Sequence, residues 1–162
     1  MARGARLLLK NSCYHIMIRG NQKQKVFFDE EDYKIFLQRL KKYKKRYNFF
    51  LYGYCLMPNH VHMIGCPKQT DELARFMKAL SISYVHYFND RYKKVGHLWQ
   101  GRFKSKVVMK DEYLLDCVNY IEQNPLRSNL SPSIATYKWS SYKERVIGDN
   151  GKSDKILDEI VL

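Results

Sequence analysis

The chain has 162 residues, of which 45% are hydrophobic and 14% aromatic, and this fits one compact domain with a core of its own. Its formal net charge of +13 points to a polyanionic partner, most commonly nucleic acid. The basic excess lies early in the chain. Residues 1–50 hold 13 Lys and Arg against 4 Asp and Glu, and residues 51–110 hold 10 against 3, whereas residues 111–162 hold 6 against 9.

Neither a membrane protein nor a disulfide-rich secreted protein is expected. The longest apolar stretch, residues 49–57, is far too short to cross a bilayer, and the first ten residues lack the apolar core of a signal peptide. The four cysteines are widely spaced and form no CxxC pair, so we expect a reduced, cytoplasmic protein.

The first half of the chain predicts a strand, a helix and a hairpin. After a basic arm in residues 1–11, residues 13–19 form a strand that ends at the turn signal Gly20-Asn21. A helix is expected from about residue 30 to 47, with acidic residues at its start and an apolar stripe. Residues 49–56 and 60–65 then predict antiparallel strands joined by Met57-Pro58-Asn59.

The second half predicts a long helix, a strand and a further helix. Thr70 is the expected N-cap of a helix that runs to about Tyr92 and is broken by Gly96. Residues 101–109 then predict a strand. A third helix is expected from Asp111 to about Gln123, because the residue before Pro125 avoids helical geometry. Trp139 and Tyr142 should pack back on the body, and disorder or a short helix is expected past Gly148.

The resulting order is β-α-β-β-α-β-α. Its first six elements predict an α+β, ferredoxin-like (split βαβ) fold with an antiparallel sheet, to which a C-terminal helix is added. We therefore expect one domain in residues 1–148, with a tail in residues 149–162.

Two patterns carry candidate chemistry. His60 and His62 flank Val61 on a strand, so both imidazoles point to the same face and could share a metal ion. Tyr120 and Asn124 are four residues apart on a helix, so Asn124 could offer an amide oxygen to the ion beside a Tyr120 nucleophile. Taken singly, each pattern favours a structural role: a half-buried polar pair without a metal, or a packing tyrosine and a helix-end asparagine.

Together, the two patterns resemble the motifs of a known family. His60-Val61-His62 matches the HUH motif (His, bulky apolar residue, His) of the HUH endonucleases, and residues 120–127, Tyr-Ile-Glu-Gln-Asn-Pro-Leu-Arg, are similar to the tyrosine helix of their single-tyrosine transposases. The REP-associated tyrosine transposases and their insertion-sequence relatives are the most similar branch. Further agreement lies in Tyr14-His15, Arg19-Gly20-Asn21, Met57-Pro58-Asn59, the run from Leu98 to Ser105, and Trp139-Ser140-Ser141-Tyr142.

The resemblance, which spans about residues 3 to 145, implies a mechanism. His60, His62 and Asn124 would hold Mg²⁺ or Mn²⁺, and Tyr120 would attack a phosphate of single-stranded, hairpin-forming DNA. The products would be a 5′-phosphotyrosine and a free 3′-OH, and another 3′-OH could reverse the step and join strands. Some insertion-sequence relatives are dimers, so a homodimer is possible, although we favour a tyrosine acting in its own chain. Ser128 replaces an alanine that is common in relatives, outside the chemistry.

Basic side chains outside this set are candidates for DNA contact. The alternation of Arg102, Lys104 and Lys106 along the predicted fourth strand would place them on one face, either at phosphates or at a solvated strand edge. The first helix carries a basic face, which is either simply solvated or part of a DNA track. The complete set of DNA-binding candidates is Arg3, Arg6, Lys10, Arg19, Lys41, Lys45, Arg102, Lys104, Lys106 and Arg127.

The sequence leaves three rival interpretations. A zinc site would need Cys55 or Cys66 beside the histidines, but Cys66 lies roughly 13 Å along an extended strand from His62, so we expect both cysteines to be small buried residues. A non-catalytic nucleic-acid-binding module on the same fold is the main alternative. An RNA-binding ferredoxin-like domain is a third, although the paired aromatics of its sheet are not obvious. His15 is expected to make a structural hydrogen bond, with a place near the metal site as the alternative.

Overall fold

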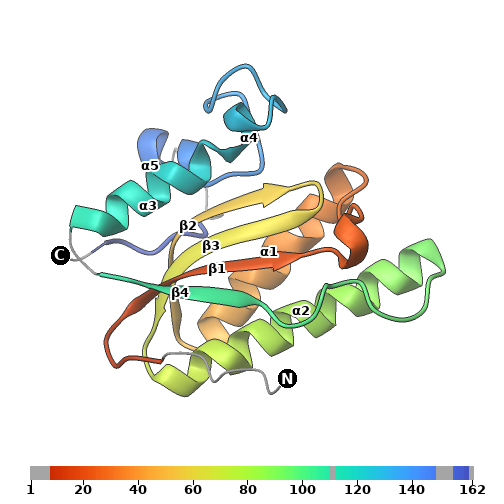
Figure 1. The fold of residues 1–162 in the computed structure, drawn as a ribbon, viewed down its shortest axis with the longest axis horizontal. Coiled ribbons are helices and arrows are strands. Elements are labelled where there is room, and N and C mark those ends of the chain that lie inside the picture. Colours follow the sequence, from red (N-terminus) through yellow and green to blue (C-terminus); the bar gives the residue numbers. More distant parts are fainter. Residues whose placement is uncertain (1–7, 110–111, 149–154, 161–162) are drawn as a thin grey trace.

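The computed structural model describes residues 8–109, 112–148 and 155–160. Its elements, in chain order, are β1 (Cys13–Arg19), η1 (Asn21–Lys23), α1 (Glu30–Arg46), β2 (Phe49–Met57), β3 (His60–Pro67), α2 (Thr70–Tyr92), β4 (Lys104–Val108), α3 (Glu112–Glu122), α4 (Asn124–Arg127) and α5 (Tyr142–Ile147). The four strands form one sheet in the order β2-β3-β1-β4, and every neighbouring pair is antiparallel. The predicted ferredoxin-like α+β fold is therefore confirmed (Figure 1).

Helices cover both faces of the sheet. On one face, alternate residues of β1 and β3 such as Ile16 and Met63 are fully buried in a core shared with Phe36 of α1 and Phe76 of α2. The other face packs a smaller core against α3, built from Leu114, Val118, Ile121, Tyr52, Ile64, Cys66, Cys13 and Val108. Figure 1 shows α3 and α5 on the opposite side of the sheet from α1 and α2.

The boundaries of α2 and β4 differ from those predicted. The N-cap of α2 is Gln69, not Thr70: the Gln69 N–H donates to the Glu72 carboxylate at 3.0 Å, and the Glu72 N–H donates to the Gln69 carbonyl at 3.1 Å. The helix ends at Tyr92, followed by Lys93 in the left-handed conformation at φ 51°, so Gly96 lies beyond the break. β4 begins at Lys104, since residues 101–103 form a loop in which Gly101 has φ 67°.

The loop before β4 runs beside the end of β1. Gly20 forms an isolated bridge with Trp99, and the Gln100 N–H donates to the Arg19 carbonyl at 2.8 Å. The turn between β2 and β3 joins the same end, because the Gly20 N–H donates to the Asn59 carbonyl at 2.8 Å. The end of β1, the turn between β2 and β3 and the 97–102 loop are thus fixed together.

Late segments close the open edge of β2. The Leu56 N–H donates to the Trp139 carbonyl at 2.8 Å, and the Ser141 N–H donates to the Tyr54 carbonyl at 2.9 Å. Further along, Asp158 bonds both backbone groups of Leu51, and its carboxylate pairs with the buried Lys44 ammonium at 2.7 Å. The expected disorder or helix is therefore wrong for residues 155–160, where Ile156 and Leu157 are buried and hold the segment down, while residues 149–154 lie outside the described residues.

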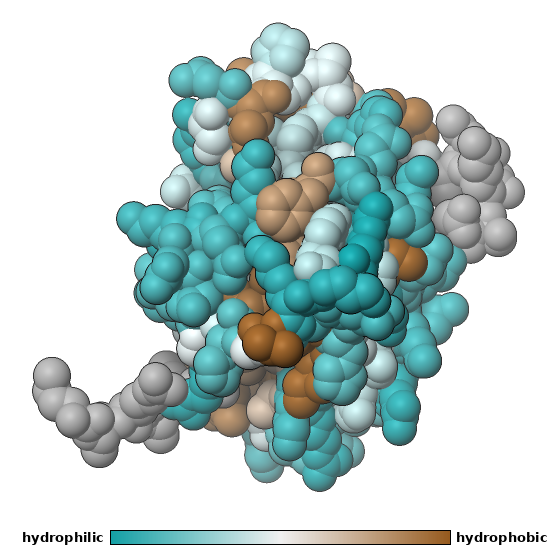
Figure 2. All heavy atoms as spheres, turned by 90° about the vertical axis from the view of Figure 1, so that its right-hand side faces the viewer, coloured by the Kyte–Doolittle hydropathy of each residue, from teal (hydrophilic) through white to brown (hydrophobic). Residues whose placement is uncertain are grey.

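The surface is largely hydrophilic on the face drawn in Figure 2. Figure 2, which faces the end of the molecule where α2 finishes, shows small separate hydrophobic patches within a largely hydrophilic surface. Across the described parts of the chain, no helix has both the length and the apolar character to cross a membrane. All four cysteines are described and remain thiols; three are buried and Cys117 is half-buried.

Candidate active site

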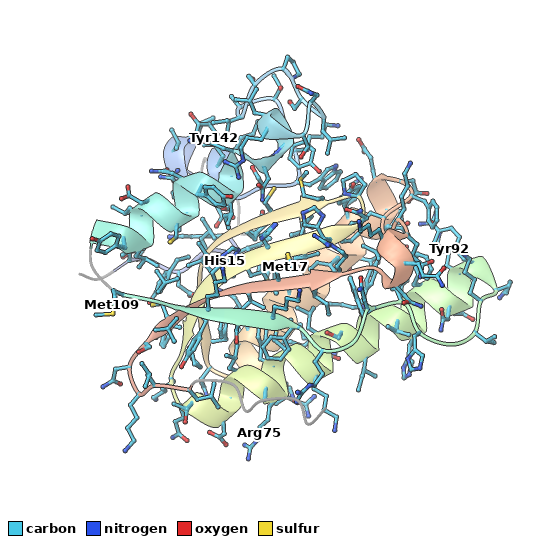
Figure 3. All side chains as sticks on the ribbon, viewed as in Figure 1. His15, Met17, Arg75, Tyr92, Met109 and Tyr142 are labelled. Carbon is cyan, nitrogen blue, oxygen red and sulfur yellow. The ribbon has the colours of Figure 1, made fainter. Side chains whose placement is uncertain are left out.

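The histidines share one face of the sheet, the face that α3 partly covers. His60 pairs with Arg19 across β1, and His62 pairs with Met17, which in turn faces Lys104 on β4. His15 lies one row further, opposite Ile64 and Lys106. Figure 3 places His15 and Met17 in the middle of the sheet, on β1. Because residues directly opposite each other point to the same side, this face carries three histidines next to three of the predicted DNA-binding cations.

Hydrogen bonds at Nδ1 orient both HUH imidazoles. Nδ1 of His60 lies 2.6 Å from the side-chain oxygen of Asn59, which can only accept, so Nδ1 must donate. Nδ1 of His62 lies 2.9 Å from Nε2 of His15. In a neutral imidazole whose Nδ1 donates, Nε2 keeps its lone pair. The expected structural hydrogen bond of His15 is thus confirmed, and it falls on a predicted metal ligand.

The environment keeps these imidazoles neutral. Burial, helped by the nearby Arg19, lowers the pKa of His60 to about 4. Burial again comes first for His62, and the neighbouring His60, His15 and Arg127 also contribute, so that its pKa falls to about 3. Burial and Lys106 lower the pKa of His15 as well. At neutral pH all three side chains therefore have an unprotonated nitrogen, which is the form that binds a metal.

Tyr120, Asn124 and Arg127 form a second cluster. Tyr120 lies in the last turns of α3 with 58% of its side chain exposed, and Asn124 opens α4, at the predicted helix break. The Arg127 guanidinium lies over the Tyr120 ring, 4.0 Å from its centroid, and donates to the Tyr120 carbonyl at 2.8 Å and to the Asn124 side-chain oxygen. The other Asn124 side-chain atom, Nδ2, is buried and has no hydrogen-bond partner among the described residues.

Arg127 connects this cluster to the histidines. Its charge contributes to the lowered pKa of His62, so the guanidinium that contacts Tyr120 and Asn124 also acts on the HUH motif. α4 packs against β2, the strand next to His62 (Figure 1). The two patterns, predicted separately from sequence, therefore converge on one side of the sheet within a single chain.

A buried ion pair that the sequence analysis missed holds the tyrosine helix. Glu122 is 1% exposed; it accepts from the Ser141 hydroxyl at 2.6 Å and from Nη2 of Arg145 at 2.6 Å. Arg145 also donates to the Asn119 side chain at 2.8 Å. The signal in the sequence was an acidic residue, Glu122, between Tyr120 and Asn124. Its partner Arg145 could not be identified, because α5 is too short to show helical periodicity.

Glycine at position 53 lets the tyrosine helix approach β2. A Cβ atom there would lie 2.9 Å from Cγ1 of Val118, which is a steric clash because non-bonded carbon atoms pack about 3.5–4.0 Å apart. The register of β2 against β3 also shifts between Leu51 and Gly53, at an irregularity typical of a bulge. The position of Tyr120 over the sheet thus depends on a missing side chain beneath the same helix.

The predicted DNA-binding residues are only partly brought together. Arg19 is half-buried beside His60, and Lys104 and Lys106 are exposed on β4. Arg102 lies in the loop before β4, so its predicted alternation with the two lysines is wrong, because the strand is shorter than expected. Lys41 and Lys45 lie on α1, across the sheet from the histidines, and Lys10 is exposed before β1; Arg3 and Arg6 lie outside the described residues.

The donor set fits an open divalent site rather than a closed zinc site. Within the described ranges, no group of three or more His, Cys, Asp or Glu side chains could hold a metal. Burial and Glu122 raise the pKa of Cys55 to about 12, so this side chain is a thiol and not a thiolate ligand. What remains is Nε2 of His60 and His62 with the Asn124 oxygen, which would leave coordination positions for phosphate oxygens.

Comparison with known proteins identifies the family. The model of the family "Transposase IS200 like" matches residues 9–124, which run from the residues before β1 to Asn124. The chain belongs to the IS200-like transposases. The matched segment of this IS200-like chain contains His60, His62, Tyr120 and Asn124, while Arg127 and Arg145 follow it.

Individual relatives of this IS200-like transposase agree. A Haemophilus influenzae protein, provisionally named a REP-associated tyrosine transposase, is 24% identical over 113 residues, covering 63% of this chain and 64%, less than two thirds, of that protein. A solved REP-associated tyrosine transposase bound to a REP hairpin has the same fold, with a TM-score of 0.77 and 16% identity over 100% of this chain and 94% of that one. A Deinococcus radiodurans structure, provisionally described as a transposase, gives a TM-score of 0.50 at 22% identity, covering 76% of this chain and 95% of that one.

Proposed function

We propose that this transposase cuts and rejoins single-stranded DNA beside a hairpin, through a covalent bond between Tyr120 and a 5′-phosphate. The observation that carries the proposal is the convergence of two Nδ1-bonded imidazoles with the Tyr120–Asn124–Arg127 cluster on one sheet face. Family membership supports transposase chemistry, and the structurally similar protein bound to a REP hairpin supports hairpin DNA as the substrate.

Mg²⁺ or Mn²⁺ would be held by His60, His62 and Asn124. Two neutral imidazoles and an amide leave the full charge of the ion available, so the ion would polarise the scissile phosphate and stabilise a phenolate as a Lewis acid. The Arg127 guanidinium donates to the Asn124 oxygen, so it uses one lone pair of that oxygen and places a positive charge beside it; Asn124 would bind an ion better once the guanidinium moves away. The released guanidinium would then be close to Tyr120 and available to a DNA phosphate.

Tyr120 would supply the nucleophile. Its exposed phenol loses a proton and its Oη bonds to phosphorus, while the bond from phosphorus to the 3′ oxygen breaks and the leaving strand takes up a proton as a 3′-OH. The phosphotyrosine retains the energy of the phosphodiester, so a 3′-OH from another strand can displace Tyr120 without ATP. Arg19, Lys104 and Lys106, on the histidine face, would bind the DNA backbone.

His15 would act as a positioning residue. For Nε2 of His62 to face a metal, Nδ1 must carry the proton, and the 2.9 Å contact then makes Nε2 of His15 the acceptor. Asn59 fixes His60 in the same way. Because the helix that carries Tyr120 packs on the histidine side of the sheet of its own chain, a tyrosine acting in cis is favoured.

A covalent-adduct assay tests the proposal. The protein is incubated with hairpin-bearing single-stranded DNA and Mn²⁺, and the product is resolved on a denaturing gel. Tyr120→Phe should abolish the adduct, whereas Tyr113→Phe, which changes another exposed tyrosine of the same helix, should retain it. An adduct that survives in Tyr120→Phe would show that Tyr120 is not the nucleophile. Binding without any adduct across many hairpins, with metal present, would favour the non-catalytic binding module.

A further inference from the structure

Three hollows lie along the outer side of α2, away from the histidine face. The largest, of about 630 Å³, lies between α2 and residues 96–102. A second, of about 270 Å³, lies between α2 and Phe103, and a third, of about 460 Å³, lies between α2 and the end of α1. Figure 3 shows Arg75, which lines the third hollow, pointing away from the sheet that carries His15.

The three hollows adjoin one another, and the surface that they share is here called the α2 groove. Ile82, which is 46% exposed, lines all of them. Lys78 is shared by the second and third hollows, His86 by the first and third, and Arg102 by the first and second. From Arg75 to His86 the groove follows about 17 Å of helix at 1.5 Å per residue.

Charge and aromatic content in the α2 groove suit a nucleic acid strand. Four cations line it, namely Arg46, Arg75, Lys78 and Arg102, and none of its described lining residues is Asp or Glu. Aromatic and imidazole side chains line it as well: Tyr43, Tyr47, Phe103, His86 and His97 are at least partly exposed, whereas Trp99 is buried. A basic groove with interleaved aromatic side chains is the usual arrangement for sequence-tolerant binding of single strands.

The cations of the α2 groove are weakly neutralised by the protein itself. Asp71 pairs with Arg75 at 3.1 Å, but both side chains are more than half exposed, so water screens the pair. Beside the groove, Arg39 makes a long hydrogen bond of 3.5 Å to the hydroxyl of Ser83, which lines the third hollow. The buried Nε of Arg39 has no hydrogen-bond partner among the described residues. A polyanion in the groove would therefore gain contacts without breaking strong internal ion pairs.

The α2 groove begins next to the candidate active site. Asn21 and Arg102 line its first hollow, and they flank the end of β1, where Gln100 bonds the Arg19 carbonyl. Arg19 faces His60 across the sheet. A strand leaving the histidine face around the end of β1 would thus pass Arg102 and enter the groove.

We propose that the α2 groove binds the single-stranded DNA that continues from the cleavage site. The inference rests on the proposed function for its substrate, but it concerns a separate surface. It explains why Arg102 lies off the β4 row: its guanidinium belongs to the groove. Single-stranded DNA fits better than a duplex stem because the aromatic side chains and Ile82 offer stacking and apolar contacts that paired bases cannot use.

Binding without cleavage tests this proposal. In a Tyr120→Phe background with EDTA, affinity is measured for a hairpin alone and for the same hairpin with a single-stranded extension on its 5′ or its 3′ side. One extension should tighten binding. The groove variant Arg46→Ala/Lys78→Ala should lose that gain, roughly 5- to 30-fold, and its salt slope on extended DNA should fall by about 1.4, the value for two lost single-strand phosphate contacts.

A charge-matched control isolates the α2 groove from the net charge. Lys93→Ala/Lys143→Ala removes two exposed cations that line none of the three hollows, and should keep the gain from the extension. Iodouracil in the extension should cross-link to Tyr43, Tyr47 or His86. The proposal is overturned if neither extension tightens binding, if both double variants lose the same affinity, or if a duplex extension binds as well as the single strand. None of these readouts uses cleavage, so a missing Tyr120 adduct would leave the groove result intact.

Discussion

Replacing Arg127 should strengthen, not weaken, metal binding by the DNA-free protein. Arg127 donates to the Asn124 oxygen, so the guanidinium uses one of its lone pairs and places a positive charge where the ion would bind, and the two cations oppose each other there. A shielded hydrogen bond to a charged group contributes about 1.5–3 kcal/mol, but Arg127 is exposed, so about 1 kcal/mol is a better value here. Arg127→Ala should therefore bind Mn²⁺ about 5-fold more tightly, since 1.4 kcal/mol corresponds to tenfold. Loss of a positive charge that acts on His62 works in the same direction.

Titration calorimetry with Mn²⁺ and no DNA measures this effect. His62→Gln should bind Mn²⁺ much more weakly, which shows that the titrated site is the intended one. Arg127→Lys keeps the charge without the planar fork and should lie between wild type and Arg127→Ala. Hairpin DNA should raise the Mn²⁺ affinity of wild type more than that of Arg127→Ala, because a DNA phosphate would draw Arg127 away from Asn124 in wild type and the variant has no such contact to lose. Equal or weaker Mn²⁺ binding by Arg127→Ala would refute the competition.

Three further results are expected. Arg145→Met leaves the Glu122 carboxylate buried without its ion-pair partner, and should lower the free energy of unfolding in urea by about 3–5 kcal/mol. The control Lys138→Met breaks the exposed pair with Glu30 and should lower it by under about 1 kcal/mol. Equal losses in the two variants would contradict the anchoring role of Arg145. His15→Phe should weaken Mn²⁺ binding by about 10- to 100-fold, with partial rescue in His15→Gln, which can still accept from His62; unchanged binding would remove its positioning role. In EDTA, the free energy of unfolding should fall as the pH drops from 6.5 towards 4, because His60 and His62 have pKa values of about 4 and 3 in the folded protein and are protonated first in the unfolded chain. At pH 5 the loss is at most about 2 kcal/mol per histidine, and less where water reaches the ring. The melting temperature of His60→Gln/His62→Gln should depend less on pH than that of wild type, and an equal dependence would contradict this cause.

Regular periodicity explains what could be predicted from the sequence. Most of the sheet and both long helices follow a period of two or 3.6 residues, and β2 is a short apolar run between turn signals, so the sequence predicts these elements to within a few positions. The shared face of His60 and His62 follows from strand alternation alone, and the helix break at Asn124-Pro125 follows from proline sterics. The strand order fits the split βαβ connectivity.

The contacts that could not be predicted depend on tertiary neighbours. Nothing local marks His15 as the partner of His62, because the two are 47 positions apart. Arg127 was expected to contact DNA, and only the structure shows its guanidinium on Asn124 and over Tyr120. The short α4 and α5 have too few turns for a periodic signal. The sequence does not indicate Gln69 as the N-cap of α2, because glutamine is not a usual N-cap residue.

The closure of the β2 edge also sets an order of assembly. Leu51 bonds to Asp158, 107 positions later, and Glu122 is fixed by Arg145 from a helix that follows the whole sheet. Such distant pairings form slowly, and a growing chain folds from its N-terminal part first. Until residues 141–158 have left the ribosome, a nascent chain can pair its four strands but has neither a sealed edge nor an anchored tyrosine helix. We therefore expect the proposed cleavage activity to be acquired as one of the last events of the chain's synthesis.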